Sequence, residues 1–322
     1  MSRQFVTKLT DGETVDEIYI ASEKQLRPNR AGNLYLQLRC SDKTGSITAM
    51  LWNADQRHYE SFENGDYVRV KATAQFYNSN MQLIIKSVAA VDATNIDVAD
   101  FQAKSTQDID RLVTKLAERL RGMRNYHLRN LAESFLIDDE LMSQLRRAPA
   151  GVKNHHAYCG GLLEHVVSLM DVAAAVAPLY PEVDVDLLLM GVFLHDIGKI
   201  QELTYSPDLG YSNSGQLLGH LVLGAILLQQ KLADMEKQTN ESFPETLALR
   251  LQHMIVSHHG EPEFGSPKVP MTFEALLLHH LDNLDAKIGS FRQIIADDAN
   301  AGSDWTTFNP QLGRKIFKAS MD

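Results

Sequence analysis

Apolar and polar residues alternate over short runs in residues 1–92 of the chain. Turn-forming residues such as Asn64-Gly65-Asp66 separate these runs, and each run has the length of a strand with one buried face. The clearest runs are NLYLQLRCSD, GSITAMLWN, DYVRVKATAQFYN and MQLIIKSVAAV. About five strands in so short a segment predict a small closed β-barrel.

Beyond residue 105 the apolar positions recur every three or four residues, which predicts helices. Asp108 and Asp110 favour a helix start there. The pattern predicts a multidomain α+β fold with a five-stranded β-barrel over residues 1–95, a helical connector over 96–150 and an all-α domain over 151–322. In the last domain, helices are expected over residues 160–177, 184–197, 214–236, 243–259 and 270–298.

The composition is that of a soluble globular protein, with 44% hydrophobic and 22% charged residues. We find no apolar run of the roughly 18 to 20 residues that span a bilayer, and the N-terminal residues lack the apolar core of a signal peptide. We therefore expect a cytoplasmic protein without a membrane partner. Cys40 and Cys159 lie far apart and are expected to be reduced thiols. The sequence does not determine the oligomeric state, so a homo-oligomer stays open.

Charge is distributed unevenly along the chain. Residues 151–322 hold 11 Lys and Arg against 21 Asp and Glu, which accounts for the whole net charge of −10. Ten of the twelve histidines also lie in this part. Most of these carboxylates are expected on a solvated acidic surface, but carboxylates beside clustered imidazoles suit divalent cations.

Several of these histidines and aspartates stand inside or at the end of apolar helical segments, as in FLHDIGK. Burying such groups without partners costs roughly several kcal/mol, and a shared metal ion would satisfy them. The candidate metal ligands are His165, His195, Asp196, His220, His258, His259 and Asp282. Any one of these histidines taken singly is more often a hydrogen-bonded core residue than a ligand, so the prediction rests on the set. Mixed imidazole and carboxylate ligands suit Mn²⁺, Fe²⁺, Co²⁺, Ni²⁺ or Zn²⁺ better than an all-oxygen Mg²⁺ or Ca²⁺ site. His253, His279 and His280 are expected to be hydrogen-bonded core residues, with His279 also a support for Asp282 one turn later.

The order of these residues resembles the HD superfamily of metal-dependent phosphohydrolases. The segments HHAYCGGLLEHV and FLHDIGK are similar to those of the YhaM-type 3′-to-5′ exoribonucleases, and the resemblance covers nearly the whole chain. It implies an OB-fold for the barrel and an HD fold for the helical domain. Paired histidines such as His258 and His259 are also typical of HD-GYP cyclic-dinucleotide phosphodiesterases, but the following HHGEPEFGSP lacks the Gly-Tyr-Pro of that group.

The resemblance implies two divalent metal ions, with Mn²⁺ the first choice and Fe²⁺, Co²⁺, Ni²⁺, Zn²⁺ or Mg²⁺ as alternatives. Asp196 would serve both ions. The first site would also take His165, His195 and Asp282, and the second His220, His258 and, as an open question, His259. Adjacent helical residues point about 100° apart, so His258 and His259 can both reach a metal only near a helix end.

Lys199 is a candidate catalytic residue that neutralises a phosphate oxygen, and a solvated lysine ending a helix is the alternative. His155, His156 and Tyr158 are candidates for substrate contact, with an ordinary loop as the alternative. Two ions would polarise a phosphoryl oxygen and lower the pKa of a water between them. Asp196 is therefore expected to be essential for catalysis.

The barrel segment resembles nucleic-acid-binding OB-folds in its order of a strand, Asp-Lys-Thr-Gly, a strand ending in Trp, and Gly-Asp before a further strand. Such folds stack bases on aromatic side chains beside basic groups. The candidates are Tyr35, Trp52, Phe76 and Tyr77 for stacking and Arg39, Arg69 and Lys71 for phosphates. Each aromatic taken alone is more often a core residue than a stacking platform.

The resulting prediction is a metal-dependent 3′-to-5′ exoribonuclease that hydrolyses single-stranded RNA to nucleoside 5′-monophosphates, with single-stranded DNA as a second substrate. The polarity and the RNA preference rest on the resemblance alone. One alternative is a phosphohydrolase or phosphodiesterase of small or cyclic nucleotides. The other is a non-catalytic protein that binds single-stranded nucleic acid.

Overall fold

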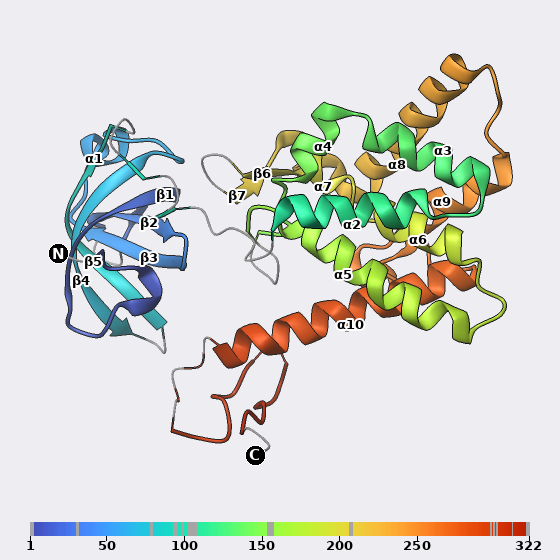
Figure 1. Ribbon diagram of the computed structural model, residues 1–322. Coiled ribbons are helices and arrows are strands. Elements are labelled where there is room, and N and C mark those ends of the chain that lie inside the picture. The colour runs from blue at the N-terminus through green and yellow to red at the C-terminus, as the bar shows by residue number, and fades with distance from the viewer. Residues whose placement is uncertain are drawn as a thin grey trace. The chain divides into compact units, whose positions relative to one another are not determined.

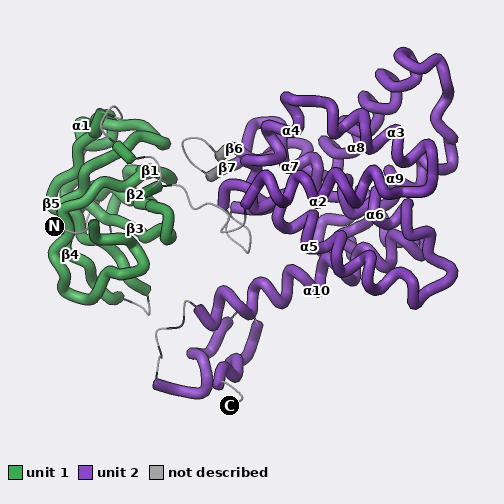
Figure 2. The backbone as a smooth tube through the Cα atoms, viewed as in Figure 1, with its two compact units in different colours: residues 1–104, 204–210 green, residues 105–203, 211–322 purple. Residues whose placement is uncertain are grey.

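The computed structural model describes residues 3–29, 32–77, 80–92, 96–97, 100–101, 108–152, 158–205, 209–296, 298, 300, 302–310 and 312–319. The chain forms two compact units, one of residues 1–104 with 204–210 and the other of residues 105–203 with 211–322 (Figure 2). The barrel strands lie in the first unit and the long helices in the second (Figure 1).

Five strands close into a barrel in the order β1-β2-β3-β5-β4, with β4 pairing back to β1. They are β1 (Thr14–Pro28), β2 (Leu34–Asp42), β3 (Gly45–Trp52), β4 (Tyr67–Tyr77) and β5 (Asn80–Ala90). A short helix, α1 (Gln56–Glu60), follows β3. β3 and β5 run parallel, and the other pairs are antiparallel. The predicted five-stranded barrel is confirmed.

β1 is the strand that the alternation pattern does not single out. Its pairing with β2 shifts register between Ser22 and Gln25, where Glu23 has a positive φ of 51°. The irregularity lets one strand pair with β4 along its first half and with β2 along its second. A bulge interrupts the two-residue period, so the sequence signal of this strand is weak.

Every second side chain of β2 and β3 points into the barrel. Leu36, Leu38 and Cys40 of β2 and Ala49 and Leu51 of β3 are buried there. Burial raises the pKa of the Cys40 thiol to about 12, which keeps it protonated and unreactive. The opposite faces of these two strands are left for solvent or a ligand.

The second unit is built of helices, which confirms the predicted all-α class. They are α2 (Ile109–Arg121), α3 (Tyr126–Leu136), α4 (Asp139–Leu145), α5 (Gly161–Val176), α6 (Val185–Leu194), α7 (Lys199–Glu202), α8 (Asn213–Thr239), α9 (Glu245–Ser257) and α10 (Phe273–Ala296). Two short strands, β6 (Leu203–Tyr205) and β7 (Leu209–Tyr211), pair with each other and come between α7 and α8 in the chain, and most of their residues are counted with the first unit. Asp108, Asn125 and Asp138 accept hydrogen bonds from main-chain N–H groups at the starts of α2, α3 and α4, as N-caps do.

The helices within residues 96–150, treated above as a connector, belong to the helical unit. α2 packs against α5 and α6, and α3 packs against α6 and α8. Leu116, Leu120 and Phe135 on these helices are fully buried. The three-part division of the chain stays a prediction, but α2 and α3 form part of the framework that holds the histidines.

α5 and the turn after it, Gly161–Leu179, are long and apolar enough to span a membrane by length and composition. The expectation that the chain holds no such run is wrong on this point. Half of the segment is buried inside the structure, and α5 packs against α2, α6 and α10. Those contacts make α5 a core helix of this unit.

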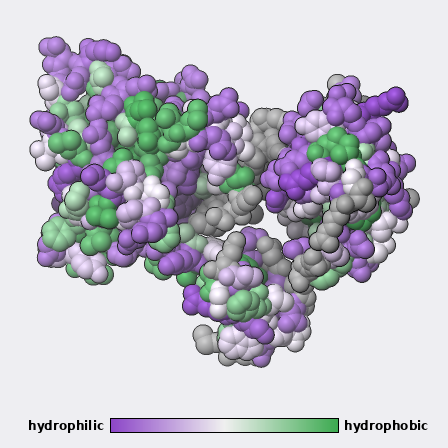
Figure 3. Space-filling model, turned by 180° about the vertical axis from the view of Figure 1, so that it is seen from behind, coloured by the Kyte–Doolittle hydropathy of each residue, from purple (hydrophilic) through white to green (hydrophobic). Residues whose placement is uncertain are grey.

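Apolar patches interrupt the hydrophilic surface in the view of Figure 3. On α8, the side chains of Leu217, Leu218, Val222 and Ile226 are exposed. Exposed apolar rows can pack against another chain. A homo-oligomer nevertheless stays a prediction.

Candidate metal centre and nucleic-acid interface

The fold brings the seven predicted metal ligands together from five segments of the helical unit. They are His165 on α5, His195 and Asp196 directly after α6, His220 on α8, His258 and His259 directly after α9, and Asp282 on α10. Helix ends matter here because α6 and α9 stop just before a pair of adjacent candidates. The main chain turns at these ends, so neighbouring side chains can converge.

The first cluster is formed by His165, His195 and Asp282. The two Nε2 atoms lie 3.3 Å apart, and Asp282 Oδ1 lies 3.3 Å from His165 Nε2 and 3.8 Å from His195 Nε2. Ligand atoms bound at about 2.1 Å to one ion are separated by roughly 3 to 3.5 Å. The spacing of these three atoms fits a single metal ion.

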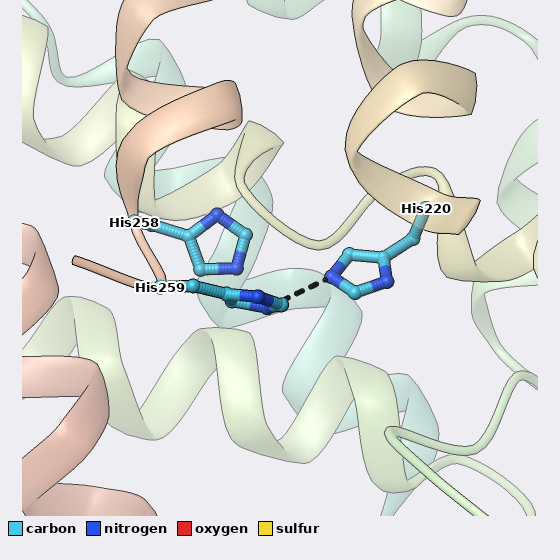
Figure 4. Close-up of side chains that lie close together, drawn as sticks. All are labelled: His220, His258 and His259. Carbon is cyan, nitrogen blue, oxygen red and sulfur yellow. Dashed lines mark hydrogen bonds between the residues drawn. The ribbon is translucent and has the colours of Figure 1, made fainter. Parts of the chain in front are cut away.

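The second cluster is formed by His220, His258 and His259 (Figure 4). His220 Nε2 lies 3.2 Å from His259 Nε2, and the rings of His258 and His259 are 4.5 Å apart between centroids and nearly perpendicular at 79°. His258 is the C-cap of α9, and Gly260 follows in a left-handed conformation with φ of 84°. The helix thus ends where both adjacent histidines can face the same point.

Asp196 lies between the two clusters and directs one carboxylate oxygen to each. Its Oδ2 lies 3.4 Å from His195 Nε2 and 3.9 Å from His165 Nε2. Its Oδ1 lies 3.5 Å from His220 Nε2 and 3.6 Å from His258 Nε2. Among the described residues, Oδ1 is buried without a hydrogen-bond partner, which is costly for a carboxylate oxygen unless a cation satisfies it.

Each of the five histidines has its Nδ1 at an oxygen that can only accept a hydrogen bond. The contacts are His165 to Asp285 (3.0 Å), His195 to the Val192 carbonyl (2.8 Å), His220 to Glu202 (3.0 Å), His258 to the Ile255 carbonyl (2.8 Å) and His259 to the Phe264 carbonyl (3.0 Å). In its neutral form each ring therefore carries its proton on Nδ1 and turns the Nε2 lone pair toward the centre. Facing lone pairs repel unless a cation lies between them.

The electrostatics of the first cluster also favour a cation. Burial disfavours charge on His165, but hydrogen bonds with Asp282 and Asp285 outweigh it and raise the pKa of His165 to about 10. Burial is the main reason that the pKa of His258 lies well below its ordinary value. A positive charge is thus favoured beside Asp282, and the second cluster offers a neutral imidazole at His258. The residues present fit divalent metal ions.

Lys199 is not a solvated lysine that ends a helix. It begins α7, its side chain is 18% exposed, and its Nζ lies 2.7 Å from Asp196 Oδ2. Burial opposes its charge, but the Asp196 carboxylate raises the pKa of Lys199 above its ordinary value. The ammonium group is therefore fixed at the edge of the centre.

The clusters open onto a cleft of about 150 Å³. Its lining residues are Ala150, Gly151, His165, Asp196, Lys199, His258, His259, Asp282 and Ala286. The small residues at positions 150, 151 and 286 leave space beside the candidate metal ligands. A phosphate group entering this cleft would meet both clusters and the Lys199 ammonium.

Of the three candidates for substrate contact that precede α5, the structure describes one. His155 and His156 lie outside the described residues. Tyr158 is half-buried, and its hydroxyl donates a hydrogen bond to Glu164 Oε2 at 2.9 Å. Its role in substrate contact stays a prediction.

Two carboxylates of the centre, Glu202 and Asp285, are absent from the sequence-based set. Asp285 lies one turn after Asp282 on α10, so helical spacing could have identified it. Glu202 contacts His220, which lies 18 residues later beyond a pair of short strands. No spacing rule connects those two positions.

His279 supports the turn that carries the paired histidines. Its Nδ1 donates a hydrogen bond to the His258 carbonyl at 2.8 Å. A Cβ at Gly260 would overlap the His279 ring. His279 therefore acts on His258 and its neighbour through the main chain, and this support differs from the one expected for Asp282.

The outward face of β2 and β3 carries some of the predicted nucleic-acid contacts. Tyr35 pairs across the strands with Trp52, and their rings lie 5.2 Å apart between centroids. Trp52 is 45% exposed, so it is not a core residue. Arg39 lies on the same face of β2 as Tyr35 and donates to Ser46 Oγ. Aromatic rings beside a guanidinium group suit a single-stranded nucleic acid.

The other predicted contacts lie on β4, which pairs with β1 and β5. Arg69 and Lys71 both contact the Asp16 carboxylate, at 2.7 and 3.6 Å. Phe76 and Tyr77 end the strand and are more than half exposed. The structure thus does not bring these four residues to the strands that carry Tyr35 and Trp52.

Comparisons with known proteins agree with both parts of the structure. A family profile described as HD domain matches residues 162–287. A second profile, described as OB-fold nucleic acid binding domain, matches residues 20–91. These matches confirm the OB type of the barrel and the HD type of the helical domain. The HD domain makes the chain a hydrolase that depends on divalent metal, and the OB-fold indicates a nucleic-acid substrate.

Three relatives, each named 3′-5′ exoribonuclease YhaM, match most of the chain. The protein of Bacillus subtilis (strain 168) is 34% identical over 280 residues, which is 86% of each chain. Those of Bacillus licheniformis and Bacillus velezensis are 34% and 33% identical over similar lengths, again 86% of each chain. A solved OB-fold domain of replication protein A from Methanococcus maripaludis matches 30% of this chain and 100% of its own, at 18% identity and a TM-score of 0.23.

Proposed function

Because the chain belongs to the family of the YhaM 3′-5′ exoribonucleases, we propose that it removes nucleotides from the 3′ end of single-stranded RNA at a two-ion centre. Mn²⁺ is the first choice for both ions, and single-stranded DNA is a second substrate. The products are nucleoside 5′-monophosphates. The observation that carries the proposal is Asp196, whose two oxygens face two separate groups of histidine Nε2 atoms.

When bound, two ions would polarise a phosphoryl oxygen and lower the pKa of a water molecule. The side chains of the protein fix where the groups around these ions would lie. Asp196 aligns both clusters, and the Nδ1 contacts hold the histidine rings with Nε2 directed inward. Lys199 places a positive charge beside the cleft, where it can stabilise negative charge on a non-bridging phosphate oxygen.

The barrel is proposed to hold the strand while the helical domain cleaves its end. Base stacking on Tyr35 and Trp52 is tolerant of sequence because every base has an aromatic face. Arg39 on the same face can contact a phosphate. Such binding suits an enzyme that moves along RNA of many sequences.

The test is cleavage of one single-stranded RNA labelled at its 5′ end in one reaction and at its 3′ end in another. A 3′-5′ exonuclease shortens the 5′-labelled strand in single-nucleotide steps and releases the 3′ label at once as a mononucleotide. Exhaustive chelation should abolish cleavage, and Mn²⁺ should restore it. Hydrolysis of cyclic dinucleotides or nucleoside triphosphates in place of RNA would overturn the proposal.

A further inference from the structure

The structure assigns a positioning role to Glu202, a side chain outside the predicted ligand set. We propose that Glu202 sets the second cluster by holding His220, so that its loss weakens metal binding there and leaves the first cluster intact. This inference rests on the proposed two-ion centre. It concerns the occupancy of one of the two sites.

The main chain of α8 is broken directly before His220. Gly219 has φ of 73° and ψ of 161°, a conformation that is essentially restricted to glycine. The break separates the His220 N–H from the regular helical pattern, in which it would bond four residues back. Instead, the His220 N–H donates to Glu202 Oε1 at 3.0 Å.

The same carboxylate also holds the ring of His220. His220 Nδ1 lies 3.1 Å from Glu202 Oε1 and 3.0 Å from Oε2. Main chain and ring are thus fixed by one side chain, which is itself buried. These two anchors direct His220 Nε2 at His259 Nε2 and Asp196 Oδ1.

The second cluster depends on this carboxylate in a way that the first does not. Of its three histidines, His258 and His259 present Nδ1 to main-chain carbonyls of their own segment. His220 instead uses a side chain from α7. In the first cluster the corresponding carboxylate is Asp285, on a different helix. A substitution at Glu202 can therefore act on one cluster alone.

The experiment measures Mn²⁺ binding to the full chain by equilibrium dialysis, together with electron paramagnetic resonance of the bound ions. Wild type should bind two ions that are magnetically coupled. Glu202→Ala should keep one tight ion and weaken the second by about 100-fold, with loss of the coupled signal. Glu202→Gln keeps an oxygen for the His220 N–H, but its NH₂ group opposes Nδ1–H, so we expect about a 10-fold loss.

Glu274→Gln is the matched control. Glu274 is another buried glutamate, which accepts a hydrogen bond from the Asp184 N–H and pairs with Arg250 at 2.7 Å. Its substitution should lower the melting temperature but keep both ions. Because Glu202→Ala could fail to fold, circular dichroism is recorded for every variant, and the isosteric Glu202→Gln decides the result in that case.

The outcomes separate the inference from its premise. Fewer than two ions in wild type would contradict the two-ion centre itself. Two ions in wild type with second-site affinity within twofold in both Glu202 variants would overturn the role of Glu202. Equal weakening of both ions, or the same loss in Glu274→Gln, would also overturn it, because a general loss of structure would then explain the effect.

Discussion

Asp196 is the negatively charged group that the Lys199 ammonium shares with the histidine rings on both sides of the carboxylate. The carboxylate is almost fully buried, contacts the Lys199 ammonium through Oδ2, and faces histidine nitrogens on both sides. Burial disfavours its charge, but Lys199 and the surrounding histidines outweigh burial and hold the pKa of Asp196 well below its ordinary value. The residue is thus ionised and able to serve two cations.

Asp196→Asn should reduce kcat on single-stranded RNA by about 100-fold or more, roughly 2.7 kcal/mol in the barrier. Asparagine keeps the size of the side chain but removes the charge and one of its two acceptor oxygens. His259→Asn, which alters one cluster only, should cost less. Both variants are compared by steady-state kinetics with Mn²⁺ in excess, after circular dichroism has shown that they fold. An Asp196→Asn enzyme within tenfold of wild type would rule out the bridging role.

At the scale of elements, the sequence predicts the candidate metal ligands better than it predicts the side chains and main-chain breaks that hold those ligands in place. The histidines could be assigned because their order along the chain resembles that of the HD superfamily. The five expected helices lie within a few residues of α5, α6, α8, α9 and α10. Glu202 and the break at Gly219 could not be assigned, because their meaning depends on how α7 packs on α8. The alternation pattern does not reveal β1 for a similar reason, since the bulge in this strand is fixed by its pairing with two different strands.

The end of α9 gives a prediction at this scale. Gly260→Ala should destabilise the protein and weaken the second cluster, because a Cβ there overlaps the His279 ring that holds the His258 carbonyl. Gly265→Ala is the matched control, since Gly265 has nearly the same φ, 83° against 84°, but no described atom within 4 Å of an added Cβ. The left-handed backbone alone costs about 1 to 2 kcal/mol.

Thermal unfolding and Mn²⁺ titration of the two alanine variants separate strain from steric overlap. Gly265→Ala should lose only the backbone contribution and bind Mn²⁺ normally. Gly260→Ala should lose more stability and bind the second ion more weakly. Equal behaviour of the two variants would show that His279 adjusts freely and does not position the paired histidines.

At the scale of the whole molecule, the proposed function places catalysis and strand binding in different units of the chain. All proposed metal ligands lie in the helical unit, whereas Tyr35, Trp52 and Arg39 lie in the barrel. The sequence pattern predicts both units, but it could not show which barrel residues share a face. That depends on strand pairing, which places Tyr35 opposite Trp52 and places Arg69 beside Asp16.

This division predicts that Trp52→Ala and Tyr35→Ala raise KM for long single-stranded RNA while kcat changes little. A lost stacking contact is worth about 1 to 3 kcal/mol, which corresponds to roughly a 5- to 150-fold rise in KM if stacking contributes only to binding. A dinucleotide, which offers no further bases for stacking on the barrel, should be cleaved equally well by wild type and variants. Arg69→Ala is the comparison, because the Asp16 carboxylate already neutralises Arg69 on another part of the barrel. Steady-state cleavage of long and short substrates by the four proteins provides the test. If Arg69→Ala raises KM as much as Trp52→Ala does, the strand lies along β4, and the face of β2 and β3 is not where RNA is held.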